Sequence, residues 1–422
     1  MLSRTEYCFL GLLVIFLLFT AVSMLQMWLG FVFAVVLIGV TYPIGIKMGL
    51  SKKEAGWLWV IILLHIVCAI ICVTHLNIVR AFGPDAIGFM HAAQAGPHPW
   101  GAGVGAYVTF IRLFYVPSPS FFSVFMTSVV GLLLFCMLLL AVAKAFQIRQ
   151  YFLPILIIAT CVPTDIISTS IALREVWEVS SIVLTVLCLM CLLNRIEGKF
   201  LHILGLLVGL CIMASLHKGL FYAAFLFVPV FYAGYQFMKI SDRVDFLIRL
   251  GIILLVLFFC GLVLSILAGR FNQFVVAALS FSGRIPDGGS TYTIFFKAGD
   301  GFVSNLLRLP LALLYYWFYP FPWDIHRVKD IYGCLVGLMR LFFILYSFYF
   351  VLTSSEPRQR HLGGALLVIL LMISMIFAIG TSNYGTSLRH NILTFWGFVT
   401  LGVPGFYLHC YRKRCRRLGI AP

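Results

Sequence analysis

The side chains that could do chemistry in this chain are isolated charges at the edges of long apolar segments. Asp85 is the first of them, and it opens a run of small and apolar residues at helical spacing that extends to Ala93. A carboxylate in this position can cap the start of a short surface helix. It can equally act as a general base if partial burial tunes its pKa. The spacing leaves both roles open.

Three more charges, Arg174, Glu175 and Glu178, lie in the apolar segment PTDIISTSIALREVWEV at residues 163–179. Charges beside apolar helix are costly and therefore face one another or a cavity. One interpretation is an Arg–Glu pair that joins helices. The other is an arginine that presents a forked donor to a phosphate and is oriented by one of the glutamates. Lys218, between two later apolar runs, suits an interfacial anchor or the same phosphate site.

Two further basic residues, Arg284 and Arg308, lie in a charge-rich segment at 269–330 that ends in an aromatic run. Within that run the sequence Phe-Pro-Trp-Asp places Trp323 next to Asp324. Aromatic faces of this kind stack on sugar rings, and they also form belts at the membrane interface. The run therefore predicts a contact surface for one of these two partners.

The last polar segment, GTSNYGTSLRHNILTFW at residues 380–396, carries Arg389 and His390. Its Gly, Ser, Thr and Asn residues offer hydroxyl and backbone donors beside a fixed cation, as an oxyanion-binding pocket does. A turn with an interfacial arginine has the same composition, so both interpretations stay open.

Motifs of established catalytic chemistry are missing from the sequence. It contains no Walker A loop, no GxGxxG motif on a strand, no HExxH motif and no nucleophile elbow. The 12 cysteines lie mostly in apolar stretches and lack metal-ligand spacing. The sequence therefore identifies no cofactor, and the question of a divalent metal at the site stays open.

The composition explains why these charges are so isolated. Of the 422 residues, 62% are hydrophobic and 10% are charged, against about 25% charged residues in an average soluble domain. The mean hydropathy is +1.06, and apolar runs long enough to cross a bilayer recur from Tyr7 to Tyr411. These values exclude a soluble single-core enzyme, a disordered chain and a disulfide scaffold. They predict an all-α polytopic membrane protein with a single integral membrane domain over residues 1–422.

Hydropathy predicts about twelve transmembrane helices, with long outer connectors that carry interfacial helices. The spans are expected near residues 7–24, 26–46, 57–79, 120–143, 151–167, 179–193, 200–216, 219–238, 250–268, 331–352, 362–380 and 391–410. We interpret the first as an uncleaved span, although Ala21-Val22-Ser23 could pass for a signal-peptide cleavage site. Residues 306–322 are apolar enough to cross, but their Trp, Tyr and Pro content favours an interfacial or re-entrant segment.

The net charge of +16 resides in the connectors between these spans. Placing the main basic clusters on the cytoplasmic side puts both termini inside, including a short basic tail at 411–422. The long connectors at about 80–119, 269–330 and 381–390 then lie outside, with more basic residues than the positive-inside rule predicts. The charges do not gather on a soluble face, so no nucleic-acid partner is indicated. Long outer loops with excess cations instead predict a site for an anionic ligand.

Several segments resemble known membrane proteins. The segment GPDAIGFMHAAQ resembles the first extracytoplasmic loop of GT-C-type glycosyltransferases, which carries an early acidic residue. The later segments SIALREVWEV, FYPFPWD and GTSLRHNILTFW resemble parts of multi-pass proteins of bacterial surface-polysaccharide assembly. The likeness follows the order of the chain over most of its length, through short motifs. The sequence departs from the GT-C pattern in lacking an acidic pair in the first loop.

The resemblance implies an inverting glycosyltransferase of the bacterial cytoplasmic membrane, with its active site facing the exterior. By position, Asp85 would activate the acceptor hydroxyl, and Arg174, Lys218 and Arg389 would neutralise the phosphate of the leaving group. The partners would be membrane lipids, a polyprenyl-linked sugar donor and a glycan or lipid acceptor.

Two alternatives stay open beside this transferase. An O-antigen or capsule repeat-unit polymerase, or a related ligase, would use the same donors and would depend more on loop Arg and His residues than on Asp85. A transporter or flippase of lipid-linked glycans would show internal repeats and charges along a mid-membrane path. The chain shows no convincing repeat, and Arg340 is the chief charge inside a predicted span.

Overall fold

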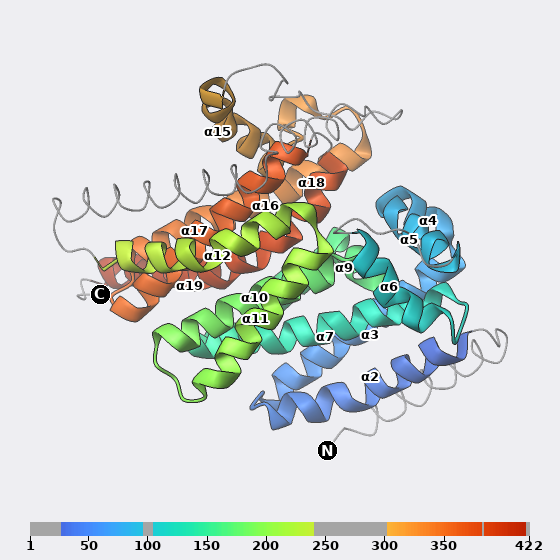
Figure 1. Cartoon of the computed structure of the whole chain (residues 1–422). Coiled ribbons are helices and arrows are strands. Elements are labelled where there is room, and N and C mark those ends of the chain that lie inside the picture. The colour runs from blue at the N-terminus through green and yellow to red at the C-terminus, as the bar shows by residue number, and fades with distance from the viewer. Residues whose placement is uncertain (1–26, 96–103, 240–301, 382–383, 419–422) are drawn as a thin grey trace. The chain divides into compact units, whose positions relative to one another are not determined.

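The computed structural model of the chain describes residues 27–95, 104–239, 302–381 and 384–418. These residues form α-helices and short 3-10 turns, and no strand occurs among them. The predicted all-α class is confirmed for this part of the chain (Figure 1).

Within the described residues, nine helices are long and apolar enough to cross a membrane. At 18 to 26 residues each, they are about 27 to 39 Å long, which matches the roughly 30 Å apolar thickness of a bilayer. Each overlaps a predicted span, and the ends differ by at most seven residues. They are α2 (Trp28–Lys47), α3 (Lys52–Thr74), α7 (Phe121–Ala145), α10 (Glu175–Leu193), α11 (Lys199–Leu216), α12 (Lys218–Phe237), α16 (Val328–Thr353), α17 (Pro357–Gly380) and α19 (Ile392–Arg417).

The span predicted at 151–167 is broken into two helices. The first helix spans Arg149–Thr160 and includes α8 (Phe152–Thr160). The second is α9 (Pro163–Ser170), and the chain bends by 76° between the two. Val162, between them, is extended, because the ring of Pro163 disfavours the helical conformation in the residue before it. Pro163 also lacks the N–H group that would donate the next hydrogen bond of α8. The predicted spans at 7–24 and 250–268 lie outside the described residues, so the total of twelve stays a prediction.

The predicted outer connectors contain short helices where the structure describes them. The first carries α4 (Leu76–Phe82), α5 (Pro84–Ala95) and α6 (Val104–Tyr115). The second carries α15 (Phe302–Phe318), followed by a cis Tyr319-Pro320 bond and the 3-10 turn η3 (Pro322–Asp324). The third carries α18 (Tyr384–His390). The interfacial position of 306–322 stays a prediction.

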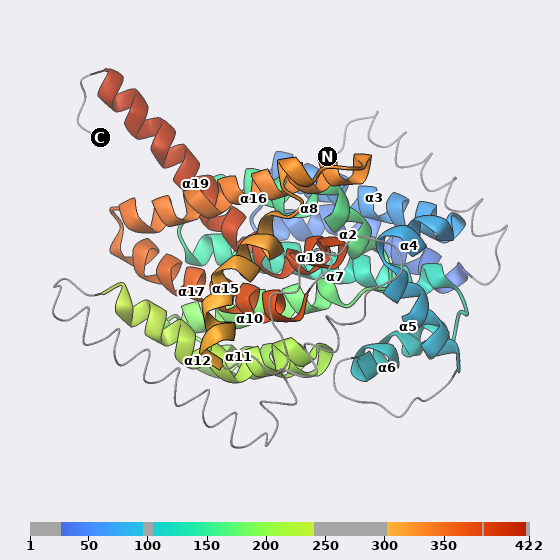
Figure 2. The same cartoon turned by 90° about the horizontal axis from the view of Figure 1, so that it is seen from above.

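The helices group into two compact units, which we describe separately. Unit 1 comprises Met1–Leu139, Leu156–Ser181 and Ser215–His217; unit 2 comprises Leu140–Ile155, Ile182–Ala214 and Lys218–Pro422. In unit 1, α3 packs against α2, α4 and α9. In the same unit, α5 lies beside α6 (Figure 2). The Trp59 indole fastens the α2–α3 hairpin by donating to the carbonyl of Ile38 at 3.1 Å.

Unit 2 is built on α16, α17 and α19, with α12 packed along α17. The predicted basic tail is helical as far as Arg417, because α19 continues into it, and Arg412 donates to the carbonyl of Thr353 at 2.7 Å. The contact between α16 and α19 is close: a Cβ atom added at Gly402 would lie 2.7 Å from the Phe343 carbonyl oxygen. Small residues at such crossings let membrane helices approach each other.

We expect Gly402→Ala to destabilise the protein, because the added methyl group meets a helix backbone that cannot move aside easily. Overpacking of this kind costs about 1–3 kcal/mol, which should lower the midpoint of thermal unfolding in detergent. Gly380→Ala is the matched control, since a Cβ atom added at Gly380 would have nothing within 4 Å. Equal midpoints for the two variants would show that the α16–α19 contact is looser than described.

Candidate functional site

The first candidate residue, Asp85, lies in the first turn of α5 and is exposed. The helix begins at Pro84, a residue well suited to a first helical position. Asp85 therefore lies one residue inside the helix and does not occupy the preceding cap position that the sequence suggested. Its carboxylate still lies in the first turn of the helix, where an acidic side chain interacts favourably with the helix dipole.

Gly83 lets the start of α5 approach the segment that leads to Arg174. A Cβ atom at Gly83 would lie 2.6 Å from the Cδ1 atom of Ile171 and 3.2 Å from the Cδ1 atom of Leu173. A larger residue at position 83 would therefore push the two segments apart. This close packing places the first turn of α5 next to the residues that precede α10.

Phe89 connects α5 to Arg174. It is four residues after Asp85, so the two side chains lie on the same face of the helix, one turn apart. The Phe89 ring centre lies 6.0 Å from Cζ of Arg174, a cation–π contact, and 5.4 Å from the ring centre of Tyr107. The structure thus brings Asp85 within one helical turn of a residue that contacts the guanidinium.

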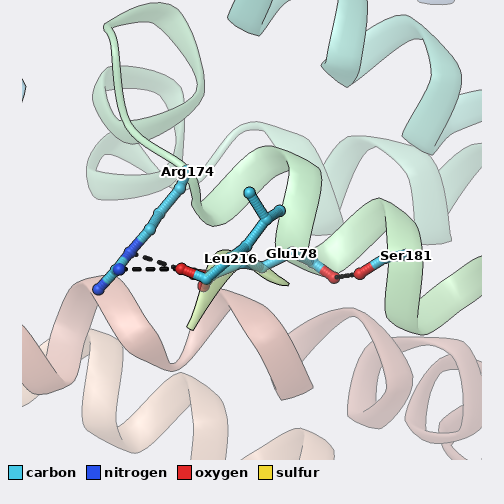
Figure 3. Close-up of polar contacts among 4 residues, drawn as sticks. All are labelled: Arg174, Glu178, Ser181 and Leu216. Carbon is cyan, nitrogen blue, oxygen red and sulfur yellow. Dashed lines mark hydrogen bonds and ion pairs between the residues drawn. The ribbon is translucent and has the colours of Figure 1, made fainter. Parts of the chain in front are cut away.

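Arg174 makes two polar contacts, shown in Figure 3. Its Nε atom lies 3.2 Å from Oε1 of Glu178, and its Nη1 atom donates to the carbonyl of Leu216 at 2.9 Å. Leu216 is the last residue of α11, so this carbonyl lacks a partner within the helix and carries part of the negative end of the helix dipole. The Arg–Glu pair considered from the sequence is therefore present, and it also joins α10 to the end of α11.

The guanidinium keeps donors beyond these two contacts. A guanidinium has five N–H groups in a planar fork, and the Arg174 side chain is 15% exposed. The two engaged atoms fix its orientation. An anion that reached the exposed part could accept from the remaining N–H groups, as the phosphate interpretation requires.

Two buried carboxylates accompany this cation. Glu175 is 2% exposed and Glu178 is fully buried. Burial, followed by the negative charge of Glu175, raises the pKa of the Tyr107 hydroxyl, which therefore stays protonated. The two glutamates offset the positive charge of Arg174, so an anion that binds there would need further cations. Sequence patterns gave no signal for Phe89 or Tyr107, because both lie in ordinary apolar helix.

The remaining described candidates belong to unit 2. Lys218 is the exposed first residue of α12, and Arg308 is half-buried on α15. Asp324 is half-buried, and Trp323 is 75% exposed. Arg284 lies outside the described residues.

Arg389 and His390 are the last two residues of α18, where buried His390 packs on Phe377 with ring centres 4.9 Å apart. The buried Arg340 side chain donates to the Leu388 carbonyl at 3.0 Å and so holds this segment against α16. The sequence singled out Arg340 as a charge within a span without assigning it this supporting position. The structure thus groups Asp85, Arg174 and the two glutamates in unit 1, and Arg389 with His390 in unit 2. That both groups form one site stays a prediction.

A metal centre finds no support in the part of the chain that the structure describes. No three His, Cys, Asp or Glu side chains come together there as metal ligands do. Whether the site takes a divalent metal stays open, as it was from the sequence.

Comparisons with known proteins give no match: no protein-family model, no curated protein and no solved structure matches the chain.

We expect Arg174→Ala to be strongly destabilising, because it leaves the buried Glu178 carboxylate without its cation. Removing one partner of a buried pair costs about 3–5 kcal/mol, whereas replacing both with apolar side chains is often neutral. The double variant Arg174→Met/Glu178→Leu should therefore unfold at a higher temperature than Arg174→Ala alone. If thermal unfolding in detergent shows both variants equally unstable, the ion pair is not the source of the loss.

Proposed function

We propose that the chain is a GT-C-like glycosyltransferase, which transfers a sugar from a polyprenyl-phosphate-linked donor to a glycan or lipid acceptor. One observation carries this proposal: a single helix, α5, presents the exposed Asp85 carboxylate one turn from Phe89, and Phe89 contacts the oriented Arg174 guanidinium. A base and a phosphate-binding cation are the two groups that this reaction needs from the protein.

The proposed reaction is a single displacement at the anomeric carbon. Asp85 accepts the proton of the acceptor hydroxyl, and the hydroxyl oxygen attacks the anomeric carbon from the side opposite the phosphate. The new glycosidic bond forms as the bond between the anomeric carbon and the phosphate oxygen breaks, so the configuration inverts. The lipid phosphate leaves with the electron pair of that bond and gains negative charge.

Arg174 suits the leaving group because its orientation is set before the ligand arrives. The contacts with Glu178 and the Leu216 carbonyl fix the fork, so donating to the phosphate requires little reorganisation. Since Glu175 and Glu178 offset its charge, we assign additional neutralisation to Lys218, which follows Leu216 by two residues in the chain.

We further propose that this site faces the exterior of a bacterial cytoplasmic membrane and that both termini are cytoplasmic. The order of charges along individual helices supports this orientation. Lys47 ends α2, and Lys52 and Lys53 begin α3, which itself ends at Thr74, shortly before α5. In the same way, α10 begins directly after Arg174 and ends just before Arg195. If the basic turns lie inside, Asp85 and Arg174 lie outside.

We expect Asp85→Asn to reproduce the phenotype of a gene deletion when surface polysaccharide from the host bacterium is separated on a gel. The amide has nearly the shape of the acid but cannot accept the proton, and loss of a general base slows such reactions about 10²–10⁴-fold. Glu197→Gln, at an exposed carboxylate between α10 and α11, is the matched control and should restore the normal pattern. Immunoblots of membranes verify equal amounts of protein.

The same gel tests the proposal against its alternative. A shift of the core or single-unit band on Asp85→Asn supports the transferase. Full activity of Asp85→Asn would remove Asp85 from the mechanism. Loss of the long-chain ladder with one repeat unit retained, caused by Arg389→Ala and not by Asp85→Asn, would instead indicate a repeat-unit polymerase.

A further inference from the structure

The last turn and a half of α19 carries four exposed basic side chains, which we call the basic helix end: Lys413, Arg414, Arg416 and Arg417. They lie within five consecutive residues of a helix that continues to Arg417. None of them forms an ion pair within the part of the chain that the structure describes. Like charges held this close repel one another, so the arrangement favours the binding of an anion.

Contacts with α16 hold the basic helix end in place. The rings of Tyr346 and Tyr349 on α16 lie with their centres 5.7 and 5.5 Å from the ring centre of His409. Three residues later, Arg412 donates to the carbonyl of Thr353, the last residue of α16, at 2.7 Å. The basic helix end therefore continues past the end of α16, as Figure 2 shows.

The cations lie on the side of α19 that faces away from the bundle. Arg412 and Cys415 are three residues apart on one face, where Arg412 binds α16 and Cys415 is buried. Lys413, Arg416 and Arg417 have the i, i+3, i+4 spacing of a different face, and all three are exposed. This face is therefore open to a partner, and its position relative to α16 is fixed.

Exposed tyrosines precede the cations on the same helix. Tyr407 and Tyr411 are four residues apart, and their side chains are 48% and 57% exposed. Tyrosine is enriched where a membrane helix passes the lipid headgroups. With 26 residues, α19 is about 39 Å long and exceeds the roughly 30 Å apolar thickness of a bilayer. The basic helix end, directly after the tyrosines, is thus expected at the depth of the headgroups.

Further cations lie at the same end of unit 2. Lys239, at the end of α12, places its Nζ atom 4.4 Å from the ring centre of Tyr235. Tyr235 in turn contacts the ring of His361 at 5.8 Å, next to the exposed Arg360 in the first turns of α17. Because α17 begins at Pro357, four residues after α16 ends, these groups share one end of the bundle with the basic helix end.

The headgroup of an anionic phospholipid matches this surface. Its phosphate oxygens accept from guanidinium and ammonium groups, and it lacks the quaternary ammonium with which a choline headgroup would repel them. Each Lys or Arg side chain near an anionic membrane surface adds to the attraction, within about one Debye length of 8–10 Å. The exposed Glu356 in the turn before α17 offsets a single charge, so this end of unit 2 stays positive.

Orientation by the positive-inside rule explains basic residues on one side of the membrane. It does not distinguish the basic helix end from the cluster Lys47, Lys52 and Lys53, whose side chains are also exposed. The surroundings of the two clusters differ. Glu54 lies among the three lysines and accepts from the backbone N–H of Ser51 at 2.8 Å. The lysine cluster therefore serves as a comparison for charge without a lipid site.

We propose that the basic helix end binds the headgroup of an anionic phospholipid, with its phosphate held by Lys413, Arg416 and Arg417. This lipid site goes beyond the proposed transfer reaction, because it requires neither Asp85 nor Arg174. It also holds whichever leaflet the end of α19 meets.

The test is native mass spectrometry of the purified full chain in nonionic detergent. The probes are equal amounts of phosphatidylglycerol and phosphatidylcholine with matched acyl chains. We expect the unmodified chain to prefer phosphatidylglycerol for its first bound lipid. The variant Lys413→Gln/Arg416→Gln/Arg417→Gln should lower this preference about tenfold or more, since each basic side chain near an anionic headgroup contributes about fivefold.

The matched control is Lys47→Gln/Lys52→Gln/Lys53→Gln, which removes the same three charges from exposed positions elsewhere. It should keep the preference of the unmodified chain. Equal loss in both variants would overturn the inference, because net charge alone would then attract the lipid. An undiminished preference after the three changes in α19, or no preference in the unmodified chain, would also overturn it.

Asp85→Asn should bind phosphatidylglycerol as the unmodified chain does, because Asp85 lies on α5 in unit 1. Failure of the proposed transfer reaction and failure of this inference are therefore distinguishable.

Discussion

A bilayer interior offers no water to a peptide group or a charge, and this constraint determines most of the structure. It explains why the described chain consists of long apolar helices whose backbone groups pair within each helix. It also explains why three arginine side chains donate to carbonyl groups at the ends of helices. Arg174 donates to Leu216, Arg340 to Leu388 and Arg412 to Thr353, and each acceptor is a carbonyl in the last turn of a helix. One type of contact thus satisfies a cation and a helix end together.

The irregular segment between α9 and α10 obeys the same constraint. Irregular backbone at membrane depth is tolerated only where protein or a water-filled cavity surrounds it. The segment after α9 meets this condition, because the Ser128 hydroxyl donates to the Ile171 carbonyl at 2.6 Å. The extended residues before Arg174 are therefore satisfied by a neighbouring helix, and this fixes where α10 begins. The position of Arg174 depends on that start.

The sequence predicts the parts of this fold that depend on composition along the chain. Nine spans were predicted closely, because an apolar run of about 20 residues has one stable arrangement in a bilayer. The break at Pro163 was missed, since hydropathy averages over a proline. Long-range contacts were also beyond prediction. The bond between Tyr384 and Asp330 joins residues 54 apart in sequence, and no periodicity of either helix indicates it. For the same reason the sequence singled out Asp85 and Arg174 separately but not Phe89, which connects them.

The buried glutamates beside Arg174 bear on how a phosphate could use this cation. A lone arginine would bind any anion strongly and would hold the product as firmly as the substrate. An arginine partly neutralised by Glu178 binds a singly charged phosphodiester more weakly. Its fixed N–H groups can still bind the additional negative charge that develops on the phosphate during the reaction. Catalysis requires interactions that are stronger in the transition state than in the bound substrate. Under the proposed function, the leaving phosphate gains charge as the glycosidic bond forms. The ion pair that stabilises the helices would then also make Arg174 bind the transition state more strongly than the bound substrate.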